Sequence, residues 1–460
     1  MSVPEIAIIG SGPSGFFAAE GLLKSDAGAR VDMFDRLPTP YGLVRSGVAP
    51  DHQHIKQVVK VFDVLANNPK FAFFGNVDVG RDLSLDHLRS RYDAVILAYG
   101  ASAGTRLSIP GSQLPQSITA TDFVGWYNGH PDFTNLDPRF DHECAVIIGQ
   151  GNVAIDVARI LLSDHARLAK TDIADHALEA LRHSRVRRVH LVGRRGPIQA
   201  SFTTAELREL LDLSDVRVVI DHDAMQLGEE DHGFLELPAN AAIKRNVDII
   251  NAAASRDMDG AATKELHLDF LVSPFSIEGS DRVEAVHFAR NRLEGPVNGR
   301  KAVPCKERFS ISAGLTIASI GFQGRPLGDV PFDEQRGIIP NVEGRVTGEM
   351  NGAAPLYVTG WIKRGATGII GTNRADAVET VRTLLSDFRD QRWLVRTDRQ
   401  RDTLLANPRI DFADWKRIDE AECLSGRAAG RPRRKIVSID AMLEVARAGK
   451  APAAPSQPGP

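Results

Sequence analysis

A glycine-rich turn near the start of the chain constrains the fold more than any other feature of the sequence. Residues 6–9 are all apolar and predict a parallel strand that is buried on both faces. The turn Gly10-Ser-Gly-Pro-Ser-Gly15 follows, then a segment of helical character, and residues 31–35 predict a second strand. A strand, a glycine turn, a helix and a strand in this order form a βαβ unit. We therefore expect an α/β protein.

The glycines of this turn and the acid that ends the second strand indicate a dinucleotide site. Gly10 permits the tight turn, Gly12 lets the backbone come close to a pyrophosphate, and Gly15 lets the helix pack on the strand. The first amide groups of the helix then face the phosphates. Asp35 is placed to accept hydrogen bonds from ribose hydroxyls. The alternative, a glycine turn without a ligand, does not explain why the strand, the helix and the acid occur together.

A second βαβ unit begins much later and ends differently. Residues 145–148 predict a strand, Gly149-Gln-Gly151-Asn-Val-Ala154 supplies the turn, and residues 189–192 predict the next strand. That strand ends at Arg194 and Arg195 instead of at an acid. Guanidinium groups suit a 2′-phosphate, and two charge-assisted hydrogen bonds at about 1.5–3 kcal/mol each would favour NADP over NAD by about a hundredfold or more. The alternative is an exposed arginine pair on a solvated turn.

The two sites differ in the ribose that they accept, and this difference indicates which cofactors are paired. The first site accepts a ribose with free hydroxyls, as in the AMP half of FAD, and the second accepts a phosphorylated ribose. One FAD and one NADPH form the simplest pair, because two NAD-type cofactors would have no electron acceptor between them. The nicotinamide would pass hydride to the flavin, and the protein would align the two.

The order of the remaining strands predicts that one nucleotide-binding domain is inserted in the other. Residues 93–100 and 356–360 predict further strands of the first domain, a helix is expected from about Thr372, and residues 315–321 predict the strand that leads back to it. We expect two Rossmann-like domains, with the NADP-binding domain at 106–324 inserted in an FAD-binding domain formed by 1–105 and 325–395. The extension at 396–460 is expected to be charged and irregular, and its end at 451–460 to be disordered.

Composition excludes several other classes of protein. The net charge of −3 over 460 residues does not suit bulk nucleic-acid binding. Cys144, Cys305 and Cys423 lie far apart and form no CxxC, metal-ligand spacing or disulfide framework, which fits a reducing compartment. The apolar runs are too short for a membrane span, and the first strand begins too early for a targeting segment. We expect a cytoplasmic protein without a metal site.

Five longer stretches carry a family resemblance. They are spread over roughly residues 5–380 and comprise LPTPYGLVRSGVAPDH (37–52), GQGNVAIDVAR (149–159), GRRGPIQ (193–199), FTTAELRE (202–209) and WIKRGATGIIGTN (361–373). With these stretches the chain resembles the adrenodoxin-reductase type of ferredoxin–NADP reductase, in particular its bacterial members.

The resemblance implies which residues contact each cofactor. The implied FAD contacts are Ser14, Asp35, Leu43, Val79, Trp361, Gly368, Ile369 and Ile370. The implied NADP contacts are Gln150, Gly151, Asn152, Val153, Arg194, Arg195, Glu206 and Gly368. In the family an arginine after the turn at Gly100 also reaches the nucleotide; here Arg106 stands in a loop one residue longer than the family's.

His52 and Glu209 resemble a pair that the family places beside the redox centre. A histidine with a near-neutral pKa can orient water or move a proton as the flavin is reduced. The alternatives are a hydrogen-bonded loop histidine and an ordinary acid on a helix surface. Lys363 and Arg364 could hold a phosphate or an acidic partner, or could be solvated charges.

The resemblance also implies electron transfer to a ferredoxin-type iron–sulfur protein. The cluster must belong to that partner, because this chain has no cysteine set for one. Ferredoxins are usually acidic, so we expect transient electrostatic docking. One candidate surface is the cluster of Arg182, Arg185, Arg187 and Arg188 with Arg194 and Arg195, although part of it is committed to NADP. Three alternatives remain. The first is a reductase subunit of the glutamate-synthase type, which would bring an N-terminal cysteine cluster. The second is a flavin monooxygenase, or another flavin-dependent NADPH oxidoreductase, with a small-molecule acceptor, and the third is a redox sensor that binds NADPH without turnover.

Overall fold

The chain forms two compact units, each built from more than one segment. The computed structural model describes residues 3–256, 262–348, 354–393 and 409–448. The first unit runs to Ala103, takes in Asn128–Pro131 and resumes at Phe322, and the second consists of Gly104–Tyr127 and Asp132–Gly321. The chain therefore passes from one unit to the other near residues 103 and 321, a few residues before the expected boundaries at 105/106 and 324/325. The short segment at 128–131 belongs to the first unit.

The first unit contains a seven-stranded sheet in the order β16-β17-β18-β4-β1-β2-β3. The strands from β18 to β3 are parallel, whereas β16 and β17 add an antiparallel edge. The strands of this sheet are β1 (Glu5–Ile9), β2 (Arg30–Phe34), β3 (Phe71–Phe74), β4 (Ala94–Leu97), β16 (Asn341–Val342), β17 (Arg345–Val346) and β18 (Leu356–Val358). The sequence-predicted βαβ unit is therefore present, with α1 (Pro13–Leu23) between β1 and β2.

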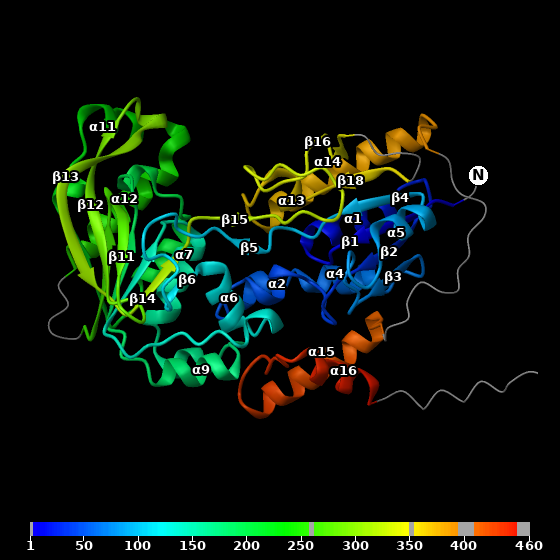
Figure 1. Cartoon of the computed structure of the whole chain (residues 1–460), viewed down its shortest axis with the longest axis horizontal. Coiled ribbons are helices and arrows are strands. Elements are labelled where there is room, and N and C mark those ends of the chain that lie inside the picture. Colours follow the sequence, from blue (N-terminus) through cyan, green and yellow to red (C-terminus); the bar gives the residue numbers. More distant parts are fainter. Residues whose placement is uncertain (1–2, 257–261, 349–353, 394–408, 449–460) are drawn as a thin grey trace, which may run out of the picture. The chain divides into compact units, whose positions relative to one another are not determined.

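Both faces of this sheet are covered, which explains the wholly apolar sequence of β1. Ile6 and Ile8 pack into a core with α1, α4 (Val59–Ala66) and α14 (Ile370–Arg389), and α1 lies beside α14 (Figure 1). Ala7 and Ile9 face a second core that includes residues of α5 (Leu85–Arg91) and of the segment before β16. The helices of this unit are α1, α2 (Leu43–Ser46), α3 (Gln53–Lys56), α4 (Val59–Ala66), α5 (Leu85–Arg91), α13 (Trp361–Arg364), α14 (Ile370–Arg389), α15 (Phe412–Ala428) and α16 (Ile439–Arg447).

The sequence led us to expect an irregular C-terminal extension, but the described part of this extension is helical. It contains α15 and α16, which pack against each other, and α15 also contacts β3 (Figure 1). Trp415 and Ile418 of α15 join the core of the first unit. The periodicity was hard to recognise because Asp414 and Glu422 occupy two of the buried positions of the helix. The segment expected to be disordered, 451–460, lies outside the described residues.

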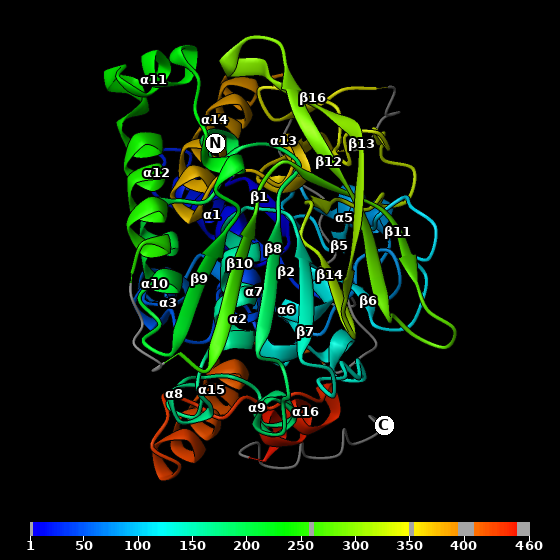
Figure 2. The same ribbon diagram turned by 90° about the vertical axis from the view of Figure 1, so that its left-hand side faces the viewer.

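The second unit contains a six-stranded parallel sheet in the order β6-β14-β7-β8-β10-β9, seen nearly face-on in Figure 2. Its strands are β6 (Ser117–Thr119), β7 (Cys144–Ile148), β8 (Arg188–Val192), β9 (Val216–Ile220), β10 (Lys264–Asp269) and β14 (Leu315–Ala318). The helices are α6 (Ala120–Asn128, ending in the first unit), α7 (Asn152–Leu162), α8 (His165–Leu168), α9 (Asp175–Arg182), α10 (Thr204–Leu211), α11 (Glu229–Leu235) and α12 (Ala241–Ala254).

A three-stranded antiparallel sheet covers one face of this parallel sheet. It consists of β11 (Val272–Glu278), β12 (Ala285–Glu294) and β13 (Lys301–Ser312). Val146 and Val192 of the parallel sheet pack with Val286 and Phe288 of β12, whereas the opposite face packs on α7 and α10. Two-residue strands, β5 (Ala103–Gly104) and β15 (Phe322–Gln323), lie at the two crossings. No described helix in either unit is both long enough and apolar enough to span a bilayer.

Candidate functional site

The first glycine turn has the backbone geometry that only glycine accommodates. Gly10 has φ +106°, and a Cβ on it would lie 2.5 Å from the carbonyl oxygen of Ala98. A Cβ on Gly15 would lie 2.1 Å from the carbonyl oxygen of Gly10. These two glycines therefore allow β1, α1 and the end of β4 to approach closely, as the sequence predicted.

Gly12 is required for a different reason, because its missing side chain leaves open space. No atom lies within 4 Å of the position of a Cβ on Gly12. Gly12 is the N-cap of α1, and Pro13 occupies the first helical position, where its missing amide hydrogen costs nothing. The free amide groups of the first turn thus stand beside an open glycine surface. This arrangement fits the pyrophosphate of a dinucleotide.

Asp35 fixes the turn from the end of β2. Its carboxylate accepts hydrogen bonds from the Ser11 amide at 2.9 Å, the Ser11 hydroxyl at 2.5 Å and the Leu37 amide at 2.9 Å. A carboxylate has about four acceptor positions, so one is left for a ribose hydroxyl. Asp35 therefore has a structural role in the turn in addition to the predicted contact with the ribose.

The segment that contains Trp361, Gly368, Ile369 and Ile370 meets the glycine turn within the first unit. Ser14 of α1 and Asn373 of α14 are joined by a hydrogen bond of 3.0 Å. The Trp361 indole donates to the carbonyl oxygen of Thr367 at 3.2 Å. Gly368 has φ +83°, Ile369 is the N-cap of α14, and Ile370 is its first residue. The structure thus brings together residues implied as FAD contacts that lie more than 300 residues apart in the sequence.

The apolar side chains among the implied FAD contacts differ in exposure. Leu43, at the start of α2, is 39% exposed, and Ile369 is 66% exposed, which is high for a large apolar side chain. Val79 is buried and forms a bridge with Leu83. Leu43 and Ile369 thus offer apolar surface to a ligand, whereas Val79 can contribute mainly through its backbone.

Lys363 and Arg364 form ion pairs within the first unit and are not simply solvated charges. The Lys363 ammonium group is buried and pairs with Asp376 at 3.0 Å and Glu379 at 2.5 Å. The Arg364 guanidinium pairs with Asp376 at 3.1 Å and donates to Asn373 at 2.9 Å. Both side chains therefore tie the 361–373 segment to α14, so neither is an isolated solvated charge.

The second glycine turn repeats the geometry of the first. Gly149 has φ +127°, and a Cβ on it would lie 2.0 Å from the carbonyl oxygen of Ser319. Gly151 is the N-cap of α7, and its nearest neighbour would be the Ser201 hydroxyl at 3.4 Å, so the space beside it is nearly open. Asn152 begins α7 and accepts the Thr203 amide at 2.8 Å. Val153 packs at the edge of the core.

Gln150 connects this turn to the end of β8. Its side-chain amide donates to the carbonyl oxygens of Leu191 at 3.2 Å and Asp269 at 3.4 Å. A Cβ on Gly193 would lie 1.9 Å from the Gln150 side-chain oxygen, so Gly193 makes room for it. Gln150 is therefore held in place by the residue that precedes Arg194.

Arg194 and Arg195 present unpaired cations at the end of β8. Arg194 is exposed and Arg195 is half-buried. Their carbonyl oxygens are fixed by the Asn291 side chain at 2.9 Å and the Leu271 amide at 3.0 Å. Within the described residues, no carboxylate pairs with either guanidinium. The backbone is thus held while both charges remain available to a phosphate.

Arg159, which the sequence analysis did not single out, holds both acids predicted on α10. Its guanidinium lies 2.8 Å from Asp156, 3.5 Å from Glu206 and 3.9 Å from Glu209. The signal in the sequence was an arginine three residues after Asp156 in a helical run that is otherwise mostly apolar. Glu206 and Glu209 are therefore members of an ion-pair cluster within the second unit.

The sequence left the roles of His52 and Arg106 open, and the structure gives the position of each within its own unit. His52 is the N-cap of α3 in the first unit, whereas Glu209 belongs to the second unit, so their pairing stays a prediction. The Arg106 guanidinium lies 3.8 Å from Asp122 and is half exposed.

Two nucleotide-type turns on two α/β units define a flavin- and pyridine-nucleotide-dependent oxidoreductase. In agreement with this class, residues 4–249 match the family model of the pyridine nucleotide-disulphide oxidoreductases. The chain is 46% identical to NADPH-ferredoxin reductase FprA of Mycobacterium tuberculosis, over 96% of this chain and 98% of the relative. It is 41% identical to the human mitochondrial NADPH:adrenodoxin oxidoreductase, over 96% and 92%.

A solved structure agrees with these sequence comparisons. The structure of Mycobacterium tuberculosis FprA in complex with NADPH superposes with a TM-score of 0.88 at 44% identity, covering 97% of this chain and 100% of that one. The chain belongs to the adrenodoxin-reductase type of ferredoxin–NADP reductase within the pyridine nucleotide-disulphide oxidoreductase family. The predicted fold class, two Rossmann-like domains with one inserted in the other, is confirmed.

Proposed function

We propose that this chain is an NADPH-dependent flavoprotein reductase whose electron acceptor is a ferredoxin-type iron–sulfur protein. When bound, FAD takes up a two-electron hydride from NADPH and releases electrons singly to such an acceptor. The observation that carries the proposal is the contrast between the two turns, since Asp35 ends one βαβ unit and Arg194 with Arg195 ends the other.

In the first unit the glycine turn at 10–15 and the 361–373 segment hold FAD. The amides after Gly12 bind the pyrophosphate, and Asp35 accepts a ribose hydroxyl. The apolar side chains of Leu43 and Ile369 and the backbone around Gly368 shield the ring system. The support for these roles is the open face of Gly12 and the meeting of Ser14 with Asn373.

In the second unit Arg194 and Arg195 bind the 2′-phosphate of NADP. The residues from Gln150 to Val153 approach its pyrophosphate at the start of α7. Glu206 completes this site, and Arg159 holds it in position. The support for the phosphate site is the absence of an acidic partner for either guanidinium among the described residues.

His52 and Glu209 are proposed to control protons beside the flavin. His52 orients water or moves a proton as the redox state of the flavin changes. The carboxylate of Glu209 lies 3.9 Å from the Arg159 guanidinium, which holds it in position. The conservative variant His52→Gln keeps hydrogen bonding but cannot transfer a proton, so it would lower the kcat of turnover.

The candidate docking surface for the iron–sulfur partner is less cationic than its sequence indicates. Arg182 lies 3.8 Å from Glu179, and the Arg188 guanidinium donates to Glu265 at 3.2 Å. Arg187 donates to carbonyl oxygens of its own loop. Of this group, Arg185 keeps the clearest role in steering an acidic partner.

We further propose that the protein works in the cytoplasm, where cell fractionation would find it.

Reduction of an isolated ferredoxin tests the proposed function. Purified holoprotein is mixed with NADPH and a plant-type or bacterial ferredoxin, and cytochrome c reduction reports the reduced ferredoxin. We expect turnover that depends on the ferredoxin and falls as salt is raised. Oxygen uptake coupled to a hydroxylated product, without ferredoxin-dependent turnover, would contradict the proposal and indicate a monooxygenase.

A further inference from the structure

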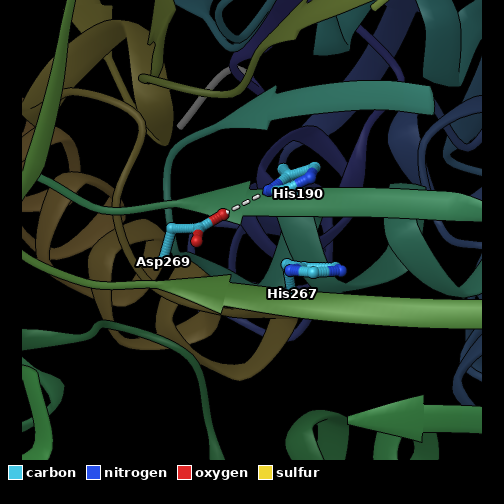
Figure 3. Close-up of side chains that lie close together, drawn as sticks. All are labelled: His190, His267 and Asp269. Atoms are coloured by element: carbon cyan, nitrogen blue, oxygen red, sulfur yellow. Dashed lines mark hydrogen bonds and ion pairs between the residues drawn. The ribbon is translucent and has the colours of Figure 1, made fainter. Parts of the chain in front are cut away.

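Two histidines and an aspartate meet on one face of the parallel sheet of the second unit. His190 is on β8, and His267 and Asp269 are on the neighbouring strand β10. The register pairs His190 directly with His267, and Figure 3 shows the two imidazoles side by side with the Asp269 carboxylate next to them. Because strand pairing alone brings the histidines together, their spacing in the sequence gave no sign of a site.

The three side chains are close enough to share one ion. The imidazole centroids are 4.3 Å apart, and the rings are inclined by 26°. His190 Nδ1 lies 2.7 Å from Asp269 Oδ2. One nitrogen of each imidazole and one oxygen of Asp269 all lie within 4.8 Å of one another. The side chains are 11%, 20% and 21% exposed, so the group is mostly enclosed but can be reached from solvent.

A second carboxylate orients His267. Nε2 of His267 lies 3.0 Å from Glu265, which is itself held by Arg188 and Arg217. When Nε2 carries the hydrogen for this bond, Nδ1 keeps its lone pair. The carboxylates of metal centres fix the tautomer and the orientation of a metal-bound histidine in the same way.

We propose that His190, His267 and Asp269 bind a divalent transition-metal ion of the Zn²⁺ type. Two imidazoles and one carboxylate are a common protein ligand set for Zn²⁺, and water completes a tetrahedral shell. Bonds of about 2.0–2.2 Å require the ligand atoms to be about 3.3 Å apart. Asp269 must therefore move away from His190, and the two stacked imidazoles must turn so that a lone pair of each faces the ion. When Nδ1 of His190 binds the ion, the hydrogen on this nitrogen moves to Nε2 of the same ring, so the imidazole ligates in its neutral form.

Zinc titration of the whole holoprotein, prepared without a histidine tag and treated with a chelator, tests the site. We expect isothermal titration calorimetry to show about one tight equivalent of Zn²⁺ per chain. His267→Gln and Asp269→Asn should abolish that binding, and Glu265→Gln should weaken it about 10- to 100-fold. His183→Gln is the matched control, since His183 is an exposed histidine of the same unit and should leave the affinity unchanged.

The spectrum of the metal separates a built site from adventitious binding. X-ray absorption at the zinc edge should show two imidazoles in the first shell of the wild type and one in His267→Gln loaded at high zinc. FAD content and thermal unfolding of each variant confirm that it is folded. Zinc binding of equal affinity in wild type, His267→Gln and Asp269→Asn, or no binding to the wild type, would overturn the proposal.

Discussion

Glu422 of α15 accepts hydrogen bonds from the guanidinium of Arg45 at 2.8 and 2.5 Å, although 377 residues separate them in the sequence. The Glu422 side chain is fully buried and also accepts from Arg433 at 2.9 Å and from the amide of Ile436 at 2.8 Å. Arg45 lies in α2, two residues after Leu43. The C-terminal helices therefore hold the loop to which we assign a flavin contact.

Removing the charge of Glu422 should destabilise the first unit. Glu422→Gln leaves Arg45 and Arg433 without their carboxylate, and losing one partner of a buried ion pair typically costs about 3–5 kcal/mol. Urea unfolding of the holoprotein measures the change. Glu420→Gln, on the exposed face of the same helix, is the control and should change stability by less than about 0.5 kcal/mol. Equal stabilities of the two variants would show that the ion pairs contribute nothing.

The same carboxylate predicts a loss of stability in acid. Burial by itself raises the pKa of Glu422, but the charges of Arg45 and Arg433 more than offset burial, so its pKa lies below the ordinary value of 4.5. A lowered folded-state pKa contributes stability above pH 4.5 that is lost as the pH falls through the folded value. The difference in unfolding free energy between wild type and Glu422→Gln should therefore shrink below that pH. A difference that is constant from neutral pH into acid would contradict this.

Alanine substitutions at Gly12 and Gly10 of the first turn should impair the protein in different ways: the first in FAD binding, the second in stability. Gly12→Ala meets no protein atom within 4 Å, so the variant should fold but lose FAD, because the methyl group occupies the space of the pyrophosphate. Gly10→Ala should instead be unstable, since its φ of +106° and its contact with Ala98 disfavour any side chain. Absorbance gives the ratio of flavin to protein, and circular dichroism gives the melting temperature.

Gly233→Ala is the matched control for these glycine variants. Gly233 lies in α11 of the second unit, and a Cβ there also meets no atom within 4 Å. It should keep the full flavin content and be slightly stabilised. If Gly12→Ala retains as much FAD as this control, the first turn is not the pyrophosphate site.

Replacing both arginines at the end of β8 should remove the preference for NADPH. Arg194→Ala combined with Arg195→Ala deletes about two charge-assisted hydrogen bonds, so the ratio of kcat/KM for NADPH to that for NADH should fall about a hundredfold or more. Arg182→Ala, an exposed arginine near Glu179, should leave the ratio unchanged. An unaltered ratio in the double variant would refute the assignment of this site.

The glycine turns and the strands around them could be predicted from the sequence because their determinants are local. The apolar run that became β1 and the acid at the end of β2 lie within one βαβ unit. Arg194 and Arg195 follow β8 directly, so their position at the carboxyl end of the sheet is fixed by the strand. The fold class followed from these local signals together.

The features that could not be predicted depend on pairing between distant segments. The buried face of α15 includes Glu422, whose charge is compensated by Arg433 and, from the other end of the chain, by Arg45. The sequence left open whether Lys363 holds a phosphate or an acidic partner or is a solvated charge, because its ion-pair partner Asp376 lies further along the chain on a different helix. His190 and His267 meet through strand register alone. No residue pattern read along the sequence reveals such partners.

Anaerobic stopped-flow reduction of the bound flavin tests the central claim most directly, namely that the two nucleotide sites prefer unlike riboses. The purified protein should be yellow, and NADPH should bleach the flavin absorbance about a hundredfold or more faster than NADH at equal subsaturating concentration. Equal rates with the two nucleotides would contradict the account, as would a colourless protein that takes up no FAD on reconstitution.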